Sequence, residues 1–398
     1  MAYAPDDLAA LTLSALMERS CVPPAEVEDV LMGCANQAGE DNRNVARTAL
    51  LLAGFPVEVA GMTINRLCGS GLDAVAQAAR AVMLGEGHVY VGAGVESMSR
   101  APWALPKPER GFTTGNATAY DTTLGWRFVN PRMQALGHTD ALGVTAEHLA
   151  QARHLFTPDE QAPDELAAAH GIGRTTQDVF ALASHRKALA AQDAGRFAGE
   201  LVPVSVTTRK GETIVAADEG PRRDTSLERL SALKPAFQTD GTVTAGNSSS
   251  LNDGAAAILL VSQEYAQSHG LKPLAKIRSM AVAGVPPRFM GIGPVPATRK
   301  ALERAKLALG DIGLIELNEA FAAQAIAVLR AWGLDADDPR VNQNGGAIAL
   351  GHPLGCSGTR LLTTLVHELK RRSDVQFGLA TTCIGVGQGI ALIVEHVP

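Results

Sequence analysis

Two parts of the chain repeat one local pattern, and this repeat limits the fold more than any other feature. Small residues at Cys68–Gly71 open a helical apolar pattern, and a short apolar run follows at Val89–Gly94. Gly355–Gly358 open a second helical pattern that reaches Leu369, and the apolar run Phe377–Thr382 follows it. A helix with one apolar face followed by a buried strand is a unit of α/β proteins. The repeat therefore predicts two structurally similar α/β halves.

Further short apolar runs have the length and composition of buried strands. They are Val27–Met32, Val57–Ile64, His88–Val95, Ala255–Val261, Ile312–Leu317 and Gly378–Thr382. Helical patterns lie between these runs, which is typical of parallel or mixed sheets. From about Ser97 to Thr239 the runs become rare, and one clear helical pattern, Thr176–Ala194, crosses this stretch. A long insertion of this kind is more often functional than idle.

Composition excludes several classes of protein. The chain has 398 residues, enough for two or three domains, and its net charge of −6 argues against a nucleic-acid partner. The five cysteines are scattered without C-x-x-C or zinc spacing, which predicts no metal site and suits a reducing cytoplasm. The N-terminal residues do not resemble a signal peptide, and no run of about 18 apolar residues predicts a membrane span.

Cys68 is the first candidate for chemistry, because it precedes Gly-Ser-Gly71 and the start of a predicted helix. Unpaired N–H groups at a helix N-terminus favour anions, so this placement predicts a lowered thiol pKa and a nucleophilic thiolate. Two other interpretations stay open at this point. Cys68 is a buried core residue in the first. In the second, Gly69–Ala74 is a dinucleotide-binding fingerprint and Glu96 supplies its acidic residue.

Three C-terminal segments place further polar groups after strands or in glycine-rich loops. Asn318 follows the predicted strand Ile312–Leu317, at the end where open α/β sheets bind ligands. His352 lies between a glycine and a proline, where its imidazole could act as a base or donor. Cys383 could exchange a proton, and the N–H of Gly385 could bind an oxyanion. A lone histidine is, in general, more often structural than catalytic.

The insertion also carries a group of cations with two interpretations. A solvated basic surface is the usual one, and a site for a phosphorylated ligand is the functional one, because arginine matches phosphate geometry. The cations are Arg209, Lys210, Arg222, Arg223, Arg229 and Lys234.

Taken together, these motifs resemble the thiolase family closely. The matching stretches are 65–71, 94–100, 244–247, 252–256, 318–322, 345–355 and Cys383-Ile-Gly385. Within that family the chain is most similar to the 3-oxoadipyl-CoA thiolases of aromatic degradation. The finer resemblance depends mainly on Asn36–Arg47 and Asp121–Pro131, since Gly291–Ala297 and Cys383–Gly389 are shared with fatty-acid thiolases.

The resemblance implies a duplicated α/β thiolase fold, with two similar domains whose mixed five-stranded sheets form αβαβα layers. We expect the N-terminal domain at 1–97 and 240–264, a CoA-binding loop domain at 98–239, and the C-terminal domain at 265–398. The usual first strand is expected to be missing, because Asp6-Asp7-Leu8 looks like the start of the first helix. The stretch Gln151–Leu166 looks inserted relative to the family, and Ser250 replaces a usual glycine.

The resemblance also implies roles for individual residues. Cys68 attacks the 3-keto carbon and becomes acylated, and His352 takes its proton. Cys383 protonates the departing acetyl-CoA enolate and later deprotonates CoA. One oxyanion is bound by the N–H groups of Cys68 and Gly385, and the enolate oxygen by His352 with a water held by Asn318. Coenzyme A is then a substrate, and no cofactor or metal is needed.

Three further residues occupy CoA-contacting positions of the family. Arg222 lies near the nucleotide, Ser249 near the pantetheine, and Phe321 lines the pantetheine tunnel. A turn serine and a core phenylalanine are the ordinary alternatives for the last two. Family members are dimers or tetramers, so we expect a homodimer or homotetramer in the cytoplasm.

The expected reaction is CoA-dependent cleavage of a 3-oxoacyl-CoA, with 3-oxoadipyl-CoA giving succinyl-CoA and acetyl-CoA in the β-ketoadipate pathway. Arg127 is a candidate for pairing with the distal carboxylate of that substrate. An acetyl-CoA C-acetyltransferase or a fatty-acid 3-ketoacyl-CoA thiolase is the alternative within the family. A non-catalytic acyl-CoA or lipid-binding protein and a nicotinamide-dependent dehydrogenase are the alternatives outside it.

Overall fold

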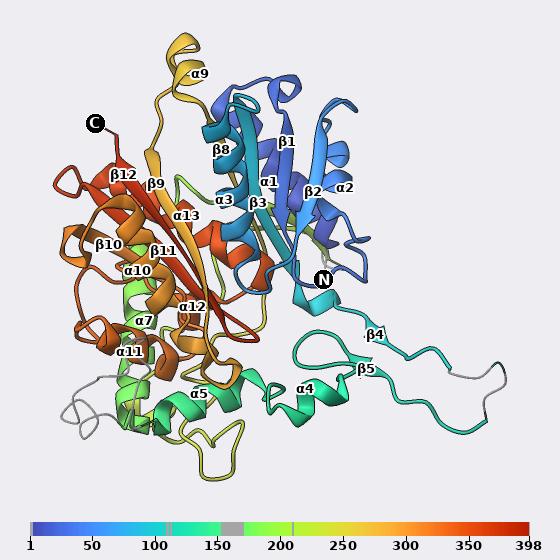
Figure 1. Ribbon diagram of the computed structural model, residues 1–398, viewed down its shortest axis with the longest axis vertical. Coiled ribbons are helices and arrows are strands. Elements are labelled where there is room, and N and C mark those ends of the chain that lie inside the picture. The colour runs from blue at the N-terminus through green and yellow to red at the C-terminus, as the bar shows by residue number, and fades with distance from the viewer. Residues whose placement is uncertain (1–2, 109–110, 112–113, 153–170, 209–210, 398) are drawn as a thin grey trace.

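The computed structural model describes residues 3–108, 111, 114–152, 171–208 and 211–397. Two sheets lie in layers with helices between them and on their outer faces (Figure 1). Most of the expected insertion Gln151–Leu166 lies outside the described residues.

The N-terminal sheet has four strands in the order β2-β1-β3-β8. Its strands are β1 (Asp29–Gly33), β2 (Ala60–Ile64), β3 (Val89–Ser97) and β8 (Asp253–Val261). β1 is parallel to β2 and β3, and β8 is antiparallel to β3. The helices of this half are α1 (Pro5–Ser20), α2 (Val45–Leu52) and α3 (Ser70–Leu84). The α1, α2 and sheet side chains share one buried apolar cluster, which covers the outer face of the sheet.

The C-terminal sheet also has four strands, in the order β10-β11-β12-β9. They are β9 (Ala275–Gly284), β10 (Ile312–Leu317), β11 (Phe377–Ile384) and β12 (Gln388–His396). β10 and β11 are parallel, whereas β12 is antiparallel to both β11 and β9. Its helices are α10 (Pro294–Ala305), α11 (Ala322–Ala331), α12 (Ala347–Leu350) and α13 (Leu354–Arg371). Helix α9 (Gln263–Ser268) connects β8 to β9, and its Tyr265 belongs to the apolar cluster of the N-terminal half.

The two sheets follow one topology, as the sequence repeat predicts. β1, α3, β3 and β8 correspond in order and direction to β10, α13, β11 and β12. The expectation of five strands in each sheet is wrong for the described residues. The counterpart of β2 is a single bridge between Val341 and Ile315, because only one residue there pairs before the chain turns away. In the described part of the chain β8 has no neighbour that corresponds to β9, and it is an edge strand there.

Helices α3 and α13 form the central layer and cross with their backbones in contact. A methyl group on Gly71 would lie 2.6 Å from the carbonyl oxygen of Gly355, and one on Gly358 would lie 2.3 Å from the amide nitrogen of Leu72. Glycine is needed at both positions because a side chain would separate the helices. The crossing brings the N-termini of the two repeated helices together.

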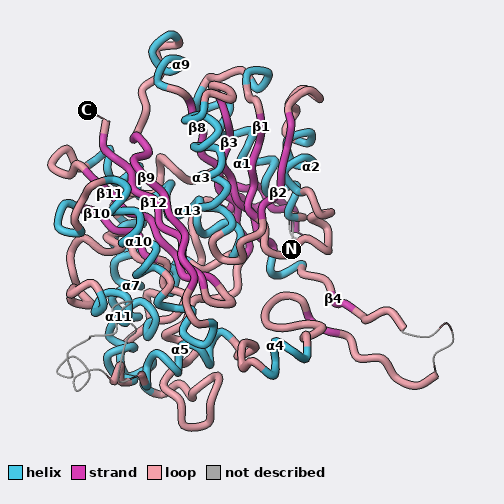
Figure 2. Tube along the Cα trace, viewed as in Figure 1, coloured by secondary structure: helices cyan, strands magenta, loops and turns pink. Residues whose placement is uncertain are grey.

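The segment between β3 and β8 contains short elements around one long helix. They are β4 (Trp103–Ala104), β5 (Tyr120–Asp121), α4 (Pro131–Ala135), α5 (Leu142–Gln151), α7 (Arg174–Asp193), β6 (Val204–Thr208), β7 (Gly211–Val215) and α8 (Leu227–Ser231). β4 and β5 pair in an arm that projects from the layered body (Figures 1 and 2). Short 3₁₀ turns lie at Pro24–Glu26, Met98–Arg100, Pro287–Ile292 and Leu309–Asp311.

Neither a membrane-spanning helix nor a cluster of metal-ligating side chains is found in the described ranges. No helix there has the length and apolar character to cross a membrane. Nor do three or more His, Cys, Asp or Glu side chains of these ranges gather as a metal site would require.

Candidate active site

Cys68 lies at the start of the central helix α3, directly before its N-cap Gly69. The side chain is buried. Burial raises the pKa of the thiol to about 11, although the N–H groups of Gly385 and of Cys68 itself oppose the rise. The expectation that the helix terminus holds a thiolate is therefore wrong for the resting protein. Removal of water destabilises the thiolate more than the N–H groups at the helix terminus stabilise it.

Cys383 approaches Cys68 from the C-terminal sheet, near the end of β11. It is buried, and burial together with the proximity of the ionisable Cys68 thiol raises the pKa of its own thiol far above the ordinary range. The tight turn after β11 then places the N–H of Gly385 against the Cys68 sulfur. Two protonated thiols and a backbone donor are thus gathered at one place.

Asn318 and His352 meet at the end of β10. The N–H of Asn318 donates to the carbonyl oxygen of Thr381 at 3.0 Å, so Asn318 lies level with β11 just before Cys383. Its Nδ2 lies 3.3 Å from Nε2 of His352. Its Oδ1 is buried and has no hydrogen-bond partner among the described residues. This oxygen is free to accept a hydrogen bond from a water or a ligand.

The hydrogen bonds of His352 indicate which ring nitrogen carries the proton and which carries the lone pair. Nδ1 lies 2.6 Å from Oγ of Ser357, and that hydroxyl donates to the carbonyl oxygen of Pro353 at 2.9 Å. Because the hydroxyl proton is used on Pro353, Ser357 accepts from Nδ1–H. Nε2 therefore carries the lone pair and can act as a base.

His352 is uncharged at neutral pH. Burial, helped by the positive charge of Arg360, lowers the pKa of the imidazole to about 4. A neutral imidazole whose Nε2 carries a lone pair can accept a proton from a neutral thiol, whereas an imidazolium cannot. The resting state is thus a pair of neutral groups rather than a thiolate and an imidazolium.

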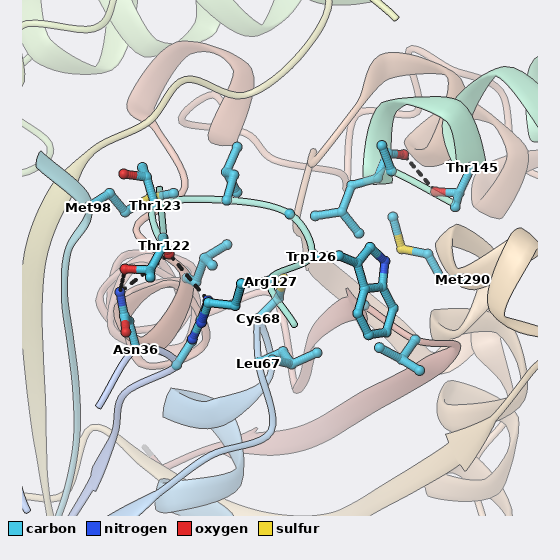
Figure 3. Close-up of a pocket in the computed structure, with 18 of the residues that line it drawn as sticks. Asn36, Leu67, Cys68, Met98, Thr122, Thr123, Trp126, Arg127, Thr145 and Met290 are labelled. Atoms are coloured by element: carbon cyan, nitrogen blue, oxygen red, sulfur yellow. Dashed lines mark hydrogen bonds between the residues drawn. The ribbon is translucent and has the colours of Figure 1, made fainter. Parts of the chain in front are cut away.

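A cavity of about 190 Å³ opens beside Cys68. Leu354, two residues after His352, lines the same cavity, as do Gly385 and Val386. The loop from Thr122 to Arg127 closes it on one side, and Met290 is also part of its lining (Figure 3). Cys68 therefore faces a space that can hold a small acyl group.

The three predicted CoA contacts lie elsewhere. Ser249 and Phe321 are close together, because Ser248 and Phe321 form a β-bridge and Ser249 Oγ donates to the carbonyl oxygen of Ala320 at 3.1 Å. Phe321 is buried in one cluster with Cys383. Arg222 is exposed, and its N–H donates to Nδ1 of His185 at 3.2 Å. None of the three lines the Cys68 cavity.

Several insertion cations are accounted for by local ion pairs. Arg223 pairs with Asp193, and Arg229 pairs with Asp224. These pairs are exposed and fit the solvated-surface interpretation. Lys234 is exposed as well, and Arg209 and Lys210 lie outside the described residues.

Glu96 and Ser357 hold the site together, although neither was predicted as a site residue. The Glu96 carboxylate accepts from the N–H groups of Ala35 at 2.9 Å, Asn36 at 3.1 Å and Gly355 at 2.8 Å, so it ties β1 to α13. Burial raises its pKa to about 6 despite these bonds. The alternative in which Glu96 is the acidic residue of a dinucleotide-binding fingerprint does not fit, because this carboxylate is buried and bound by three backbone N–H groups. The sequence signal that could have identified Ser357 is its position five residues after His352, close enough for a contact with the imidazole.

The comparisons agree with this geometry. The sequence profile of the thiolase N-terminal domain matches residues 2–264, and that of the thiolase C-terminal domain matches residues 271–396. A beta-ketoadipyl-CoA thiolase of Pseudomonas knackmussii is 54% identical over 393 residues, covering 98% of this chain and 93% of that protein.

Two further proteins extend the comparison. A 3-oxoadipyl-CoA/3-oxo-5,6-dehydrosuberyl-CoA thiolase of Escherichia coli is 52% identical over 394 residues, covering 98% of this chain and 94% of that protein. The crystal structure of human mitochondrial 3-ketoacyl-CoA thiolase has a TM-score of 0.89 and 39% identity, covering 99% of this chain and 94% of that chain. The chain therefore belongs to the thiolase family.

Proposed function

We propose that this chain cleaves 3-oxoadipyl-CoA with free CoA, giving acetyl-CoA and succinyl-CoA through an acyl group on Cys68. The identity of 54% to a beta-ketoadipyl-CoA thiolase, against 39% to a mitochondrial 3-ketoacyl-CoA thiolase, supports the dicarboxylic substrate. One observation supports the chemistry most directly: Cys68 lies beside Gly385 and Cys383. The cavity that Cys68 faces is also lined by Leu354, two residues after His352.

The first half-reaction begins with two neutral groups. Nε2 of His352 accepts the proton of the Cys68 thiol, and the sulfur attacks the 3-keto carbon. The N–H groups of Cys68 and Gly385, which face the sulfur, bind the resulting oxyanion. The C2–C3 bond then breaks, leaving a succinyl thioester on Cys68 and the enolate of acetyl-CoA.

Cys383 completes the proton transfers. Its raised pKa keeps the thiol protonated, so it can donate to C2 of the enolate. The enolate oxygen is bound by His352 and by a water on Asn318, whose Oδ1 has no partner in the described residues. In the second half-reaction Cys383 takes the proton of the CoA thiol. The CoA sulfur attacks the succinyl thioester, and Cys68 leaves and regains its proton from His352.

We assign the CoA contacts to Arg222, Ser249 and Phe321. Phe321 shares a buried cluster with Cys383, and Ser249 hydrogen-bonds to the residue preceding Phe321, so both fit a pantetheine path toward the second thiol. Arg222 is exposed, as a contact to the nucleotide requires. Arg222→Gln is expected to raise KM for CoA with little change in kcat.

The assembly that we propose is a homodimer or homotetramer. Large apolar side chains on the projecting arm are exposed, among them Trp103 at 73% and Leu105 at 60%. Exposed apolar groups of this kind mark contact surfaces. Multi-angle light scattering should show a dimer or tetramer, and a monomer across the micromolar range would contradict this proposal.

Trapping the intermediate tests the mechanism directly. Incubation with 3-oxoadipyl-CoA without CoA should add one succinyl group to Cys68, detected by peptide mass spectrometry. Cys68→Ala should abolish both the adduct and turnover, whereas Cys21→Ala, at an exposed cysteine, should change neither. Binding of acyl-CoA without any adduct would favour a non-catalytic binding protein instead.

Substrate comparison tests the acyl preference. Thiolysis rates with 3-oxoadipyl-CoA, acetoacetyl-CoA and a long-chain 3-oxoacyl-CoA separate the three family activities. We expect kcat/KM to be highest with 3-oxoadipyl-CoA. A higher value with either of the other two would replace the proposed substrate.

A further inference from the structure

One wall of the cavity beside Cys68 carries a guanidinium that has no ionic partner among the described residues. Arg127 is half-buried and lines the same cavity as Cys68. In the described part of the chain this guanidinium donates one hydrogen bond, from Nη1 to the carbonyl oxygen of Thr122 at 3.4 Å, and forms no ion pair. Because a guanidinium has five N–H donors, most of its capacity remains available to a ligand.

A buried contact holds the loop that carries Arg127. Nδ2 of Asn36 donates to Oγ1 of Thr122 at 3.0 Å and lies 3.3 Å from its carbonyl oxygen. That carbonyl is the one that also accepts from Arg127, so Asn36, Thr122 and Arg127 form one connected group (Figure 3). The buried Thr122 therefore holds the Arg127 guanidinium in place.

Asn36 and Arg127 come from the two stretches that carry the finer sequence resemblance, Asn36–Arg47 and Asp121–Pro131. These stretches are far apart along the chain, yet they meet at the wall of the cavity that Cys68 faces. The finer resemblance therefore depends on two segments that lie at the wall of the cavity beside Cys68.

The acidic groups of the cavity do not neutralise Arg127. The Glu96 carboxylate is occupied by three backbone N–H groups. Asp140 contacts His148 at 3.1 Å and Arg288 at 3.8 Å. Much of the remaining lining is apolar, including Leu67, Met98, Leu124, Trp126 and Met290. A cation with free donors in such surroundings favours an anionic ligand group.

We infer that Arg127 binds the carboxylate at the far end of the acyl chain and so selects dicarboxylic over monocarboxylic 3-oxoacyl-CoA substrates; this inference rests on the proposed function. Three carbon–carbon bonds separate the attacked carbon of 3-oxoadipyl-CoA from its carboxylate carbon, a span of about 4 Å. A succinyl group on Cys68 therefore keeps its carboxylate within the cavity that Arg127 lines. Asn36 acts as a positioning residue through Thr122.

The test compares two substrates of equal length. 3-Oxohexanoyl-CoA carries a methyl group where 3-oxoadipyl-CoA carries its carboxylate. In Arg127→Gln, kcat/KM for 3-oxoadipyl-CoA should fall about 100-fold, because two charge-assisted hydrogen bonds are lost. The value for 3-oxohexanoyl-CoA should stay within about threefold of the parent value, since a methyl group makes no such bond.

Matched variants separate recognition from folding. Arg132→Gln removes an exposed cation that lies outside the cavity lining, and it should leave both values unchanged. Arg127→Lys keeps the positive charge but not the paired N–H donors of the guanidinium. Its kcat/KM for 3-oxoadipyl-CoA should therefore fall less than that of Arg127→Gln. Product inhibition gives a second measurement: Arg127→Gln should weaken inhibition by succinyl-CoA and leave inhibition by butyryl-CoA unchanged.

The outcomes distinguish this inference from the proposed function. A parent enzyme that does not prefer 3-oxoadipyl-CoA over 3-oxohexanoyl-CoA overturns both. A parent enzyme with that preference, unchanged in Arg127→Gln, overturns the role of Arg127 alone. Equal losses on both substrates also overturn it, because they indicate damage to the site as a whole.

Discussion

At the scale of single residues, Ser357 decides which nitrogen of His352 is the base. Its hydroxyl accepts from Nδ1 at 2.6 Å and leaves Nε2 unprotonated. Ser357→Ala removes this partner, and we expect kcat/KM for thiolysis to fall about tenfold, the cost of one buried hydrogen bond. Ser357→Thr keeps a hydroxyl and should recover most of the activity. Equal rates for the alanine variant and the parent would show that the tautomer is set elsewhere.

The protonation state of Cys68 gives a second prediction at this scale. Because burial raises the pKa of its thiol to about 11, the thiolate fraction should keep increasing with pH well above neutrality. Alkylation of Cys68 by iodoacetamide should accelerate about tenfold per pH unit from pH 7 to about pH 10. Peptide mass spectrometry resolves Cys68 from the exposed Cys21. A plateau below about pH 8 would mean that a thiolate is present at rest.

The sequence predicts which residues form the site, but not their protonation states. Cys68, Asn318, His352 and Cys383 were identified by motif, and they do gather at the ends of β10 and β11 and the start of α3. Their assigned roles stay predictions. Their pKa values could not be predicted, because desolvation depends on what the distant parts of the chain place around each group.

At the scale of elements, the crossing of α3 and α13 depends on two glycines. Gly358→Ala would place a methyl group 2.3 Å from the amide nitrogen of Leu72, so the helices must separate. We expect this variant to lower the free energy of unfolding by about 1–3 kcal/mol, as overpacking does. Urea unfolding measures the loss.

A matched glycine provides the control for this prediction. A methyl group on Gly310 would meet no atom within 4 Å, so Gly310→Ala should leave the urea midpoint nearly unchanged. Equal midpoints for Gly358→Ala and Gly310→Ala would show that the crossing can relax without cost. Activity should fall with Gly358→Ala as well. The crossing fixes the starts of α3 and α13 relative to each other, and Cys68 and His352 lie directly before these two helices.

The strands of the sheets were predicted well where each is apolar and buried. The runs at Val27–Met32 and Ile312–Leu317, for example, correspond to β1 and β10. β9 was missed because polar residues break its apolar run and its edge position leaves it half-buried. β12 is not predicted from the sequence, because the glycines after Cys383 favour a loop, although the run that follows is almost fully buried in the structure.

At the scale of the whole molecule, buried carboxylates link stability to pH. Burial raises the pKa of Glu316 on β10 to about 8, opposed by Arg360 and increased by Glu200, Glu319 and Glu368. The folded chain therefore binds a proton at Glu316 that the unfolded chain, in which this carboxyl has its ordinary pKa of 4.5, has released. The contribution of Glu316 to the free energy of unfolding should therefore fall as pH rises from about 4.5 to about 8.

Glu316→Gln tests this linkage, since glutamine mimics the protonated acid. Near pH 8 His352 contributes little opposing change, because the folded imidazole has a lowered pKa and the unfolded one, with an ordinary pKa of 6.5, has lost most of its proton as well. The variant should have a flatter dependence of unfolding free energy on pH between about pH 6.5 and 8, and exceed the parent in stability at pH 8. The difference should be on the order of 1 kcal/mol per pH unit. Parallel curves for variant and parent would contradict it.

The sequence alone determined the family, the duplicated α/β plan and the residues at the ends of its strands, because local periodicity, turn glycines and motif spacing are properties of neighbouring residues. Tertiary structure decided what burial and distant contacts control. It made the thiol of Cys68 and the imidazole of His352 neutral, by removing water from both. It also joined Asn36 to the loop of Arg127, a contact that depends on how the insertion folds back over the first strand.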